Sequence, residues 1–250
     1  MLRRFLMSIL LVWTGAGAVA ASIQAVPVPP DHLRTPLERA ETMLYSETGS
    51  PREFSTLLDQ MQSTVDRDMR GVEQHYWNAR LALLHATHLN QEGNSRAAAR
   101  VAQAGLGHIA EALAPGDFSD GLRVLTDLHS QMMMARGLIY MVRHGEAARS
   151  AAFRARELDP TNVRALISVA GFYLNAPPIA GGDVQEGIRV LRSALALDPA
   201  DQNDRFIILG WLAEAHARID AVAEARRYLD EARQIYPASP WIRSIAGDMG

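Results

Sequence analysis

The amino-acid sequence predicts an all-α fold, a solenoid of helical hairpins with at least three repeats in the C-terminal half and additional helical pairs before them. A six-residue phrase recurs as Ala155-Arg-Glu-Leu-Asp-Pro160, Ala194-Leu-Ala-Leu-Asp-Pro199 and Ala232-Arg-Gln-Ile-Tyr-Pro237, with prolines 39 and 38 residues apart. Elsewhere, apolar residues follow helical spacing between cap residues. The chain is 48% hydrophobic and rich in alanine, which favours helices packed through small side chains.

The first 20 residues have the pattern of a signal peptide. Arg3 and Arg4 precede the apolar stretch Phe5 to Trp13, and Ala18-Val19-Ala20 supplies the small residues of a cleavage site. We therefore expect cleavage after Ala20 and a periplasmic or secreted protein. The alternative is an uncleaved anchor that contacts the membrane, although the apolar segment that ends at Ala21, 17 residues long, is at the lower limit for a span.

The composition excludes several functional classes. The chain has no cysteine, so disulfide scaffolds, thiolate metal sites, a cysteine nucleophile and a lipoprotein anchor are excluded. The formal net charge is −3 and no basic block stands out. We therefore expect no nucleic-acid partner.

Prolines and glycines divide the N-terminal half into segments. Residues 21–34, with prolines at positions 27, 29 and 30, are predicted to be a linker, and residues 35–128 a helical region of degenerate repeats or a cap. Thr35-Pro36 and Ser50-Pro51 each have the N-cap and first-position proline of a helix start. The expected helices begin at these two signals and continue with Val72–Gln91, Ser95–Leu113 and a helix from Leu122 to about Arg143.

Residues 129–250 resemble tetratricopeptide repeats, units of about 34 residues that form two antiparallel helices. In the unit ending at Pro237 the large and small residues of that pattern fall on Leu209, Leu212, Ala213, His216, Ala225, Leu229 and Ala232. The unit ending at Pro199 matches at Leu166, Val169, Ala170, Tyr173, Gly187, Leu191 and Ala194, with an insertion at 176–182. The unit ending at Pro160 has Gly137, Tyr140, Ala148, Ala152 and Ala155. Trp241, Ile242 and Ile245 suggest a C-terminal capping helix.

The resemblance implies an interaction scaffold rather than an enzyme. In the family, the first helix of each pair lines a concave surface that binds a segment of a partner protein. Carried over to this sequence, the groove residues are Gln131, Met134, Leu138, Met141, Arg164, Ile167, Leu174, Asn175, Trp211, Glu214 and Arg218. We expect an extended or helical partner segment anchored at Trp211, Met134 and Met141, with polar contacts from Arg164 and Arg218.

Two other functions remain open at this level. The apolar part of the groove would also suit a small molecule or lipid enclosed by the superhelix. Arg143-His144-Gly145-Glu146 resembles the opening motif of the histidine phosphatase family, in which the histidine accepts a phosphoryl group. That family places the motif at the end of a β-strand, which would here end at Val142. The helical interpretation instead ends a helix at His144, with Gly145 in the turn and Glu146 opening the next helix.

Candidate metal ligands are few. His85, His88 and Glu92 share one helix face but lack an identifiable fourth ligand, and Met132-Met133-Met134 point in three directions on a helix. The sequence therefore predicts no metal site and no cofactor. The loop Ala176–Asp183 lacks the lysine and glycine spacing of a phosphate-binding loop. Asp183 can cap the next helix, and the loop is either a shaped turn or the lip of a binding site.

Overall fold

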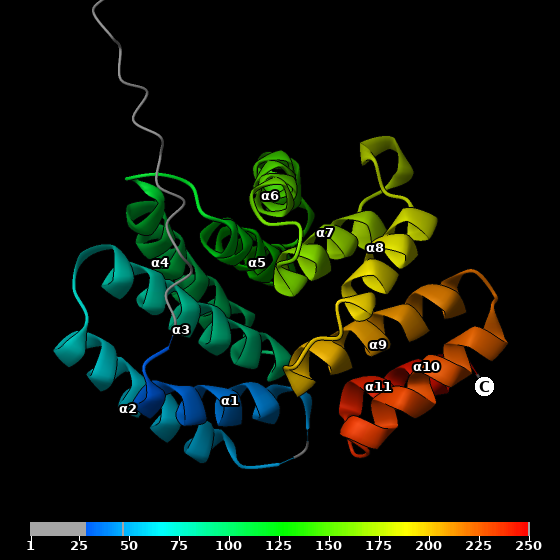
Figure 1. Cartoon of the computed structure of the whole chain (residues 1–250), viewed down its shortest axis with the longest axis horizontal. Helices are drawn as coiled ribbons and strands as arrows, with labels where there is room; N and C mark the ends of the chain where they lie inside the picture. Colours follow the sequence, from blue (N-terminus) through cyan, green and yellow to red (C-terminus); the bar gives the residue numbers. More distant parts are fainter. Residues whose placement is uncertain (1–28, 47, 250) are drawn as a thin grey trace, which may run out of the picture.

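A computed structural model describes residues 29–46 and 48–249 (Figure 1). The predicted signal peptide lies outside these residues. Within them the regular secondary structure is entirely helical, and no helix is both long and apolar enough to cross a membrane. The helices are α1 (Asp31–Tyr45), α2 (Pro51–Asp68), α3 (Gly71–Gln91), α4 (Ser95–Leu113), α5 (Ser119–Arg136), α6 (Leu138–Leu158), α7 (Val163–Asn175), the 3-10 turn η1 (Pro178–Ala180), α8 (Val184–Ala196), α9 (Gln202–Arg218), α10 (Val222–Ile235) and α11 (Pro240–Asp248).

Consecutive helices pack as hairpins, α1 with α2, α3 with α4, α5 with α6, α7 with α8 and α9 with α10. The first helices of the last four pairs contact one another in order, α3 to α5 to α7 to α9, and form an inner layer. The second helices lie outside this layer, so the pairs follow one another around an arc (Figure 1). The predicted all-α solenoid of helical hairpins is thereby confirmed.

The core is divided between two large clusters of buried side chains. One extends from Leu33 to Met132 and joins α1 to α5, and the other extends from Ala152 to Ile245 and joins α6 to α11. A small cluster of Leu122 with three alanines connects them across α5, α6 and α7. The predicted boundary between residues 128 and 129 lies inside α5, so the helix that carries it belongs to both regions.

Several predicted helix ends are confirmed by their caps. The Ser50 hydroxyl accepts a hydrogen bond from the Glu53 amide at 3.2 Å, and the Asp183 carboxylate accepts one from the Glu186 amide at 3.0 Å. Each side chain satisfies an amide that the first helical turn leaves without a backbone partner. The helix predicted over Ser95–Leu113 has these bounds, and α3 begins one residue before its predicted start.

The start of α1 differs from its prediction. The helix begins at Asp31, so Pro36 lies inside it and the last residues of the predicted 21–34 linker are helical. The extra turn buries Leu33, which is 1% exposed, beside Leu37. Burial of a leucine side chain contributes about 1.5–3 kcal/mol. This gain explains how the extra turn forms although Pro36 removes one backbone hydrogen bond.

The first repeat of the C-terminal region also differs from its prediction. The chain turns at Gly137, not at Gly145, and α6 continues through His144, Gly145 and Glu146. Gly137 has φ +70°, a conformation that glycine adopts without a side-chain clash, whereas Gly145 is an ordinary helical residue. The first helix of this repeat is therefore α5, and Leu138 and Met141 belong to its second helix.

The last two repeats and the capping helix agree with the sequence pattern. Small residues bring the helices of a pair together, because a Cβ atom added at Gly187 would lie 2.7 Å from the Leu174 side chain. At the C-terminal end, a Cβ atom on Gly210 would lie 2.4 Å from the Trp241 ring, which α11 places against α9. Glycine is therefore needed at both positions for the observed close contacts.

Candidate interaction surface

The inner side of the arc is occupied by the N-terminal helix. Besides its hairpin partner, α1 contacts both α3 and α9, and Figure 1 shows its end meeting the start of α9. Glu41 of α1 accepts hydrogen bonds from Arg80 of α3 at 2.8 Å and from Arg164 of α7 at 2.8 and 2.9 Å. The Tyr45 ring lies 5.7 Å from the Phe206 ring of α9. One helix therefore connects three helices of the inner layer.

Glu41 belongs to a largely buried group of charged side chains, here called the inner charge network. Arg80 also pairs with Asp120 of α5 at 3.6 Å, and Arg123 pairs with Asp120 within α5; Asp120 and Arg123 are 5% and 2% exposed. Arg164 joins α7 to the start of α9. Buried charges are tolerated only when they are paired and hydrogen-bonded. The network comprises the arginines Arg80, Arg123 and Arg164 and the carboxylates Glu41, Asp120, Asp127, Asp201 and Asp204.

Two carboxylates of this network have pKa values shifted in opposite directions. Burial raises the pKa of Glu41, but Arg164 and Arg80 outweigh it and lower the pKa to about 2. Burial also raises the pKa of Asp204. The attraction of Arg164 does not compensate there, because Asp201 and Glu41 repel the negative charge, and the pKa is about 6. The network thus stabilises the ionised form of Glu41 and makes ionisation of Asp204 less favourable than in an unperturbed aspartate.

Asp204→Asn is expected to stabilise the folded chain by about 1–3 kcal/mol at pH 7.5. The folded-state pKa of Asp204 lies above its unfolded value of 3.8, so its ionisation costs stability above about pH 6 and the cost disappears as the pH falls toward 4. The amide oxygen of asparagine can still accept the hydrogen bond from the Arg164 Nε. Urea unfolding at pH 7.5 and 5.0 measures the effect, and a variant less stable than wild type at pH 7.5 would contradict it.

Some residues of the predicted groove have roles inside the fold. Arg164 is held by Glu41, Asp201 and Asp204 and lies in the inner charge network. Leu174 is 5% exposed, so its side chain cannot reach a partner without rearrangement, which corrects its predicted place in the groove. Ile167 is partly buried against the C-terminal core.

The polar and aromatic groove residues lie near the surface but already have partners. Gln131 accepts a hydrogen bond from Asn90 at 2.8 Å, and Asn175 donates one to the Gly171 carbonyl. Arg218 donates to the Leu174 carbonyl at 2.6 Å and to Glu214. The Trp211 ring meets the Trp241 ring edge-on at 5.6 Å. Partner binding by these residues stays a prediction.

Met134 and Leu138 are the groove residues whose large apolar side chains project into solvent. They are 65% and 67% exposed, and they are followed in α6 by Ile139 and Val142, which are 71% and 77% exposed. These four residues at the end of α5 and the first turns of α6 are here called the apolar corner. Met141 is half-buried on the same turns. Ile139 and Val142 were missed in the sequence because their position depends on the turn at Gly137.

The charged side chains nearest the apolar corner in the sequence are both arginines. No acidic residue occurs between Asp127 and Glu146 in the sequence. Arg136 and Arg143 are exposed on either side of Leu138, and neither forms a salt bridge with a described residue. The corner therefore combines exposed apolar side chains with two cations that are free to meet an acidic partner.

The arrangement has a counterpart among solved structures. A thermophilic TPR protein of Thermus thermophilus matches with a TM-score of 0.55 over 87% of this chain and 98% of that chain, at 19% sequence identity. This chain has the tetratricopeptide-repeat fold. No protein-family model matches the sequence, and no curated protein does. The likeness therefore concerns the architecture and transfers no partner and no site residue.

The phosphatase motif has a helical environment within the tetratricopeptide-repeat fold. Val142 and His144 lie inside α6, so no β-strand leads to the motif. The His144 ring stacks on the Tyr140 ring with centroids 4.3 Å apart, and the His129 ring stacks at 5.7 Å. His216, the downstream histidine, is 3% exposed in α9. These histidines serve packing, and the motif lacks the setting that its chemistry requires.

The candidate metal ligands of α3 are also engaged in packing. The His88 ring stacks on Phe54 with centroids 4.1 Å apart. Burial lowers the pKa of both His85 and His88. Across residues 29–46 and 48–249, no group of three or more histidine, aspartate or glutamate side chains is arranged to hold a metal ion.

In the loop before α8, Ile179 is 98% exposed and η1 forms a shaped turn.

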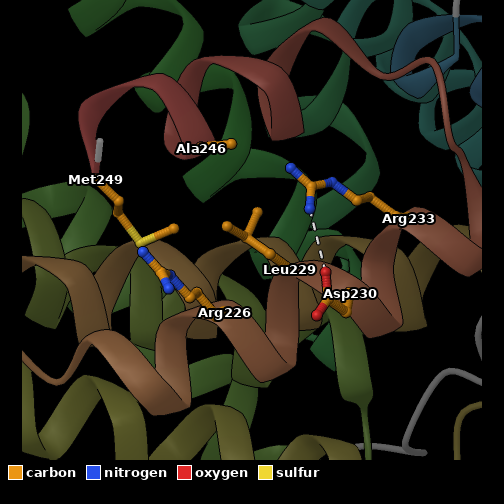
Figure 2. A pocket seen from close by; sticks show the side chains of 6 residues that line it. All are labelled: Arg226, Leu229, Asp230, Arg233, Ala246 and Met249. Carbon is orange, nitrogen blue, oxygen red and sulfur yellow. Dashed lines mark hydrogen bonds and ion pairs between the residues drawn. The ribbon is translucent and has the colours of Figure 1, made fainter.

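Two small surface cavities are lined by both charged and apolar side chains. Figure 2 shows one of about 210 Å³ between α10 and α11, where Arg226 and Arg233 flank Leu229 and Met249. Asp230 accepts a hydrogen bond from Arg233 at 3.1 Å across its edge. The second, about 280 Å³, lies among α6, α7 and α8. Typical small-molecule sites enclose about 300–1,000 Å³, so neither cavity favours the lipid-carrier alternative.

Proposed function

We propose that this chain is an exported scaffold that binds a protein partner and does not catalyse a reaction. The observation that carries the proposal is the apolar corner, four large apolar side chains that are each well exposed within nine residues of the chain. Large apolar side chains left in water at one place are a mark of interaction sites, because their exposure is unfavourable. The tetratricopeptide-repeat fold supports the proposal, since repeat solenoids present extended surfaces to partners.

The chemistry of the corner indicates how a partner would be held. Full burial of one such side chain contributes about 1.5–3 kcal/mol. Two or three anchors can therefore supply most of the energy of a specific contact, as hot spots do at other interfaces. Arg136 and Arg143 would contribute charge-assisted hydrogen bonds at the rim. The inner charge network takes no part, because α1 covers it.

Leu138→Asp and Val142→Asp are each expected to reduce partner recovery about 30-fold or more, the effect of losing one hot spot of about 2 kcal/mol. Each change places a carboxylate where the partner presents an apolar surface. Because both side chains are mostly exposed, the melting temperature should stay within a degree or two of wild type. The measurement is affinity capture from an extract of the source organism, quantified by mass spectrometry.

Ile179→Asp is the matched control, since Ile179 is an exposed apolar residue outside the corner. It should recover the same partner as wild type. Equal recovery by all four proteins would argue against the corner as the binding surface. Binding of wild type, but not Leu138→Asp, to phospholipid vesicles without any protein captured would assign the corner to lipid instead.

Export is supported by the Arg3-Arg4 region, the apolar stretch and the small residues before Ala21. Expression of the full chain in a Gram-negative host should yield a periplasmic protein whose first residue is Ala21. Intact-mass measurement of the purified chain decides the point. A full-length chain recovered from the membrane fraction would favour the uncleaved anchor.

A further inference from the structure

Two histidines face each other across the α3–α4 hairpin, away from the surfaces described above. His75 of α3 and His108 of α4 approach with their Nδ1 atoms 3.3 Å apart and their ring centroids 5.5 Å apart. Both side chains are half-buried, so water reaches the pair. No other polar group of the described residues hydrogen-bonds to either ring.

This separation is the one that a metal ion imposes on two imidazole ligands. Two nitrogens bound at about 2.0–2.1 Å to one tetrahedral Zn²⁺ lie roughly 3.3–3.4 Å apart. Imidazole is a ligand that Zn²⁺, Cu²⁺ and Ni²⁺ accept readily. With the centroids 5.5 Å apart the two Nδ1 atoms face each other almost head-on, so each ring turns about its side-chain bonds to aim its Nδ1 lone pair at one shared ion.

The hairpin holds the two rings in place. A Cβ atom added at Gly105, one turn before His108 on α4, would lie 2.8 Å from Ala82 of α3. Ala79 and Ala102 are both fully buried near this contact. Close packing through small residues fixes the spacing of α3 and α4, so both imidazole rings stay within reach of one ion.

The protonation chemistry is compatible with a metal ion. In the absence of metal, one Nδ1–H donates to the other Nδ1. Metal binding needs both Nδ1 lone pairs, and the shared proton moves through solvent to Nε2 of the same ring. Each ring then presents its Nδ1 lone pair to the ion.

We propose that His75 and His108 form a binding site for a divalent transition-metal ion of the zinc–copper–nickel class. The protein supplies two ligands, and water completes the coordination. The site lies between α3 and α4 and does not depend on the proposed partner binding. Because the ion connects two helices, it also fastens the hairpin in which it sits.

The test is a titration of the full-length folded chain with Zn²⁺ alone at pH 7.5, followed by calorimetry and by the thermal unfolding midpoint. Wild type should bind one ion and its melting temperature should rise with Zn²⁺ concentration. His75→Gln and His108→Gln should each weaken binding about tenfold or more and abolish the thermal shift, because a single imidazole is a weak site. With Cu²⁺, electron paramagnetic resonance should detect two nitrogen ligands in wild type and one in each variant.

His85→Gln is the control, because His85 and His88 are the other histidines close together on α3. This variant should bind Zn²⁺ as wild type does. Unchanged affinity in both His75→Gln and His108→Gln would overturn the proposal, as would loss of binding in His85→Gln alone. Since the three glutamine variants keep a half-buried polar side chain on a helix, their circular dichroism should match wild type and folding should not obscure the comparison.

Discussion

Glu41→Gln is expected to destabilise the folded chain by about 2–4 kcal/mol at pH 7.5. The Glu41 carboxylate accepts three hydrogen bonds from Arg80 and Arg164, and both arginines are held in the interior by these bonds. Glutamine offers one carbonyl oxygen and no charge, so part of the guanidinium charge loses its compensation. The folded-state pKa of about 2, against 4.5 for an unperturbed glutamate, indicates how strongly the interior prefers the ionised form.

The pH dependence of this effect is opposite to that of Asp204. A lowered folded-state pKa contributes stability that is present above the unfolded pKa of 4.5 and is lost as the pH falls toward 2. The difference in free energy of unfolding between Glu41→Gln and wild type should therefore become smaller as the pH falls. Urea unfolding at pH 7.5 and 3.0 measures it.

Glu41→Gln and Asp204→Asn form a matched pair, because each neutralises one carboxylate bound to Arg164. They should change stability in opposite directions. A loss of stability in both variants would mean that the network requires both charges, and the raised pKa of Asp204 would then be wrong. If Glu41→Gln left the free energy of unfolding unchanged, α1 would be held by its apolar contacts alone.

Much of the fold could be predicted because repeat proteins encode local contacts. Pro199 and Pro237 end the second helices of their pairs, and Gly187 and Ala232 permit the close approach of neighbouring helices. These signals lie within one repeat and are read from short spacings. The turn after α5 was misplaced because Gly137 and Gly145 offer the same local signal. The choice between them depends on the buried alanines of α6, which pack against α5 and α7.

The interaction surface was harder to predict because it depends on contacts distant in sequence. Glu41 and Arg164 are 123 residues apart, and no spacing rule joins them. The groove residues were carried over on the expectation that the inner side of the arc is open. Since α1 covers that side, Arg164 has its partners within the chain. Only the end of the predicted groove at Met134 and Leu138 retains exposed apolar side chains.

Phe206→Ala is expected to destabilise the chain by about 3–5 kcal/mol, the usual cost of truncating a fully buried aromatic side chain. Phe206 is 0% exposed, and its ring contacts those of Tyr45, Tyr236 and Trp241 at centroid distances of 5.7, 4.9 and 5.9 Å. These neighbours come from α1, from the end of α10 and from α11. The cavity would therefore open where the first and last helices of the solenoid meet α9.

The matched control is Phe172→Ala, since Phe172 is half-buried in α7 and its ring contacts the rings of Phe153 and Tyr173 and the Arg149 guanidinium, none of which belongs to α1 or α11. Phe172→Ala should lower the free energy of unfolding by about 1–2 kcal/mol, because part of the Phe172 side chain is already exposed to water. Urea unfolding gives both values, and amide hydrogen exchange should show faster exchange in α1 and α11 for Phe206→Ala alone. If the two variants lost equal stability, or if α1 kept its protection in both, then α1 would not be fastened to α9 through this aromatic cluster. The covering of the inner side would then rest on the Glu41 ion pairs, and the loss expected for Glu41→Gln would have to be correspondingly larger.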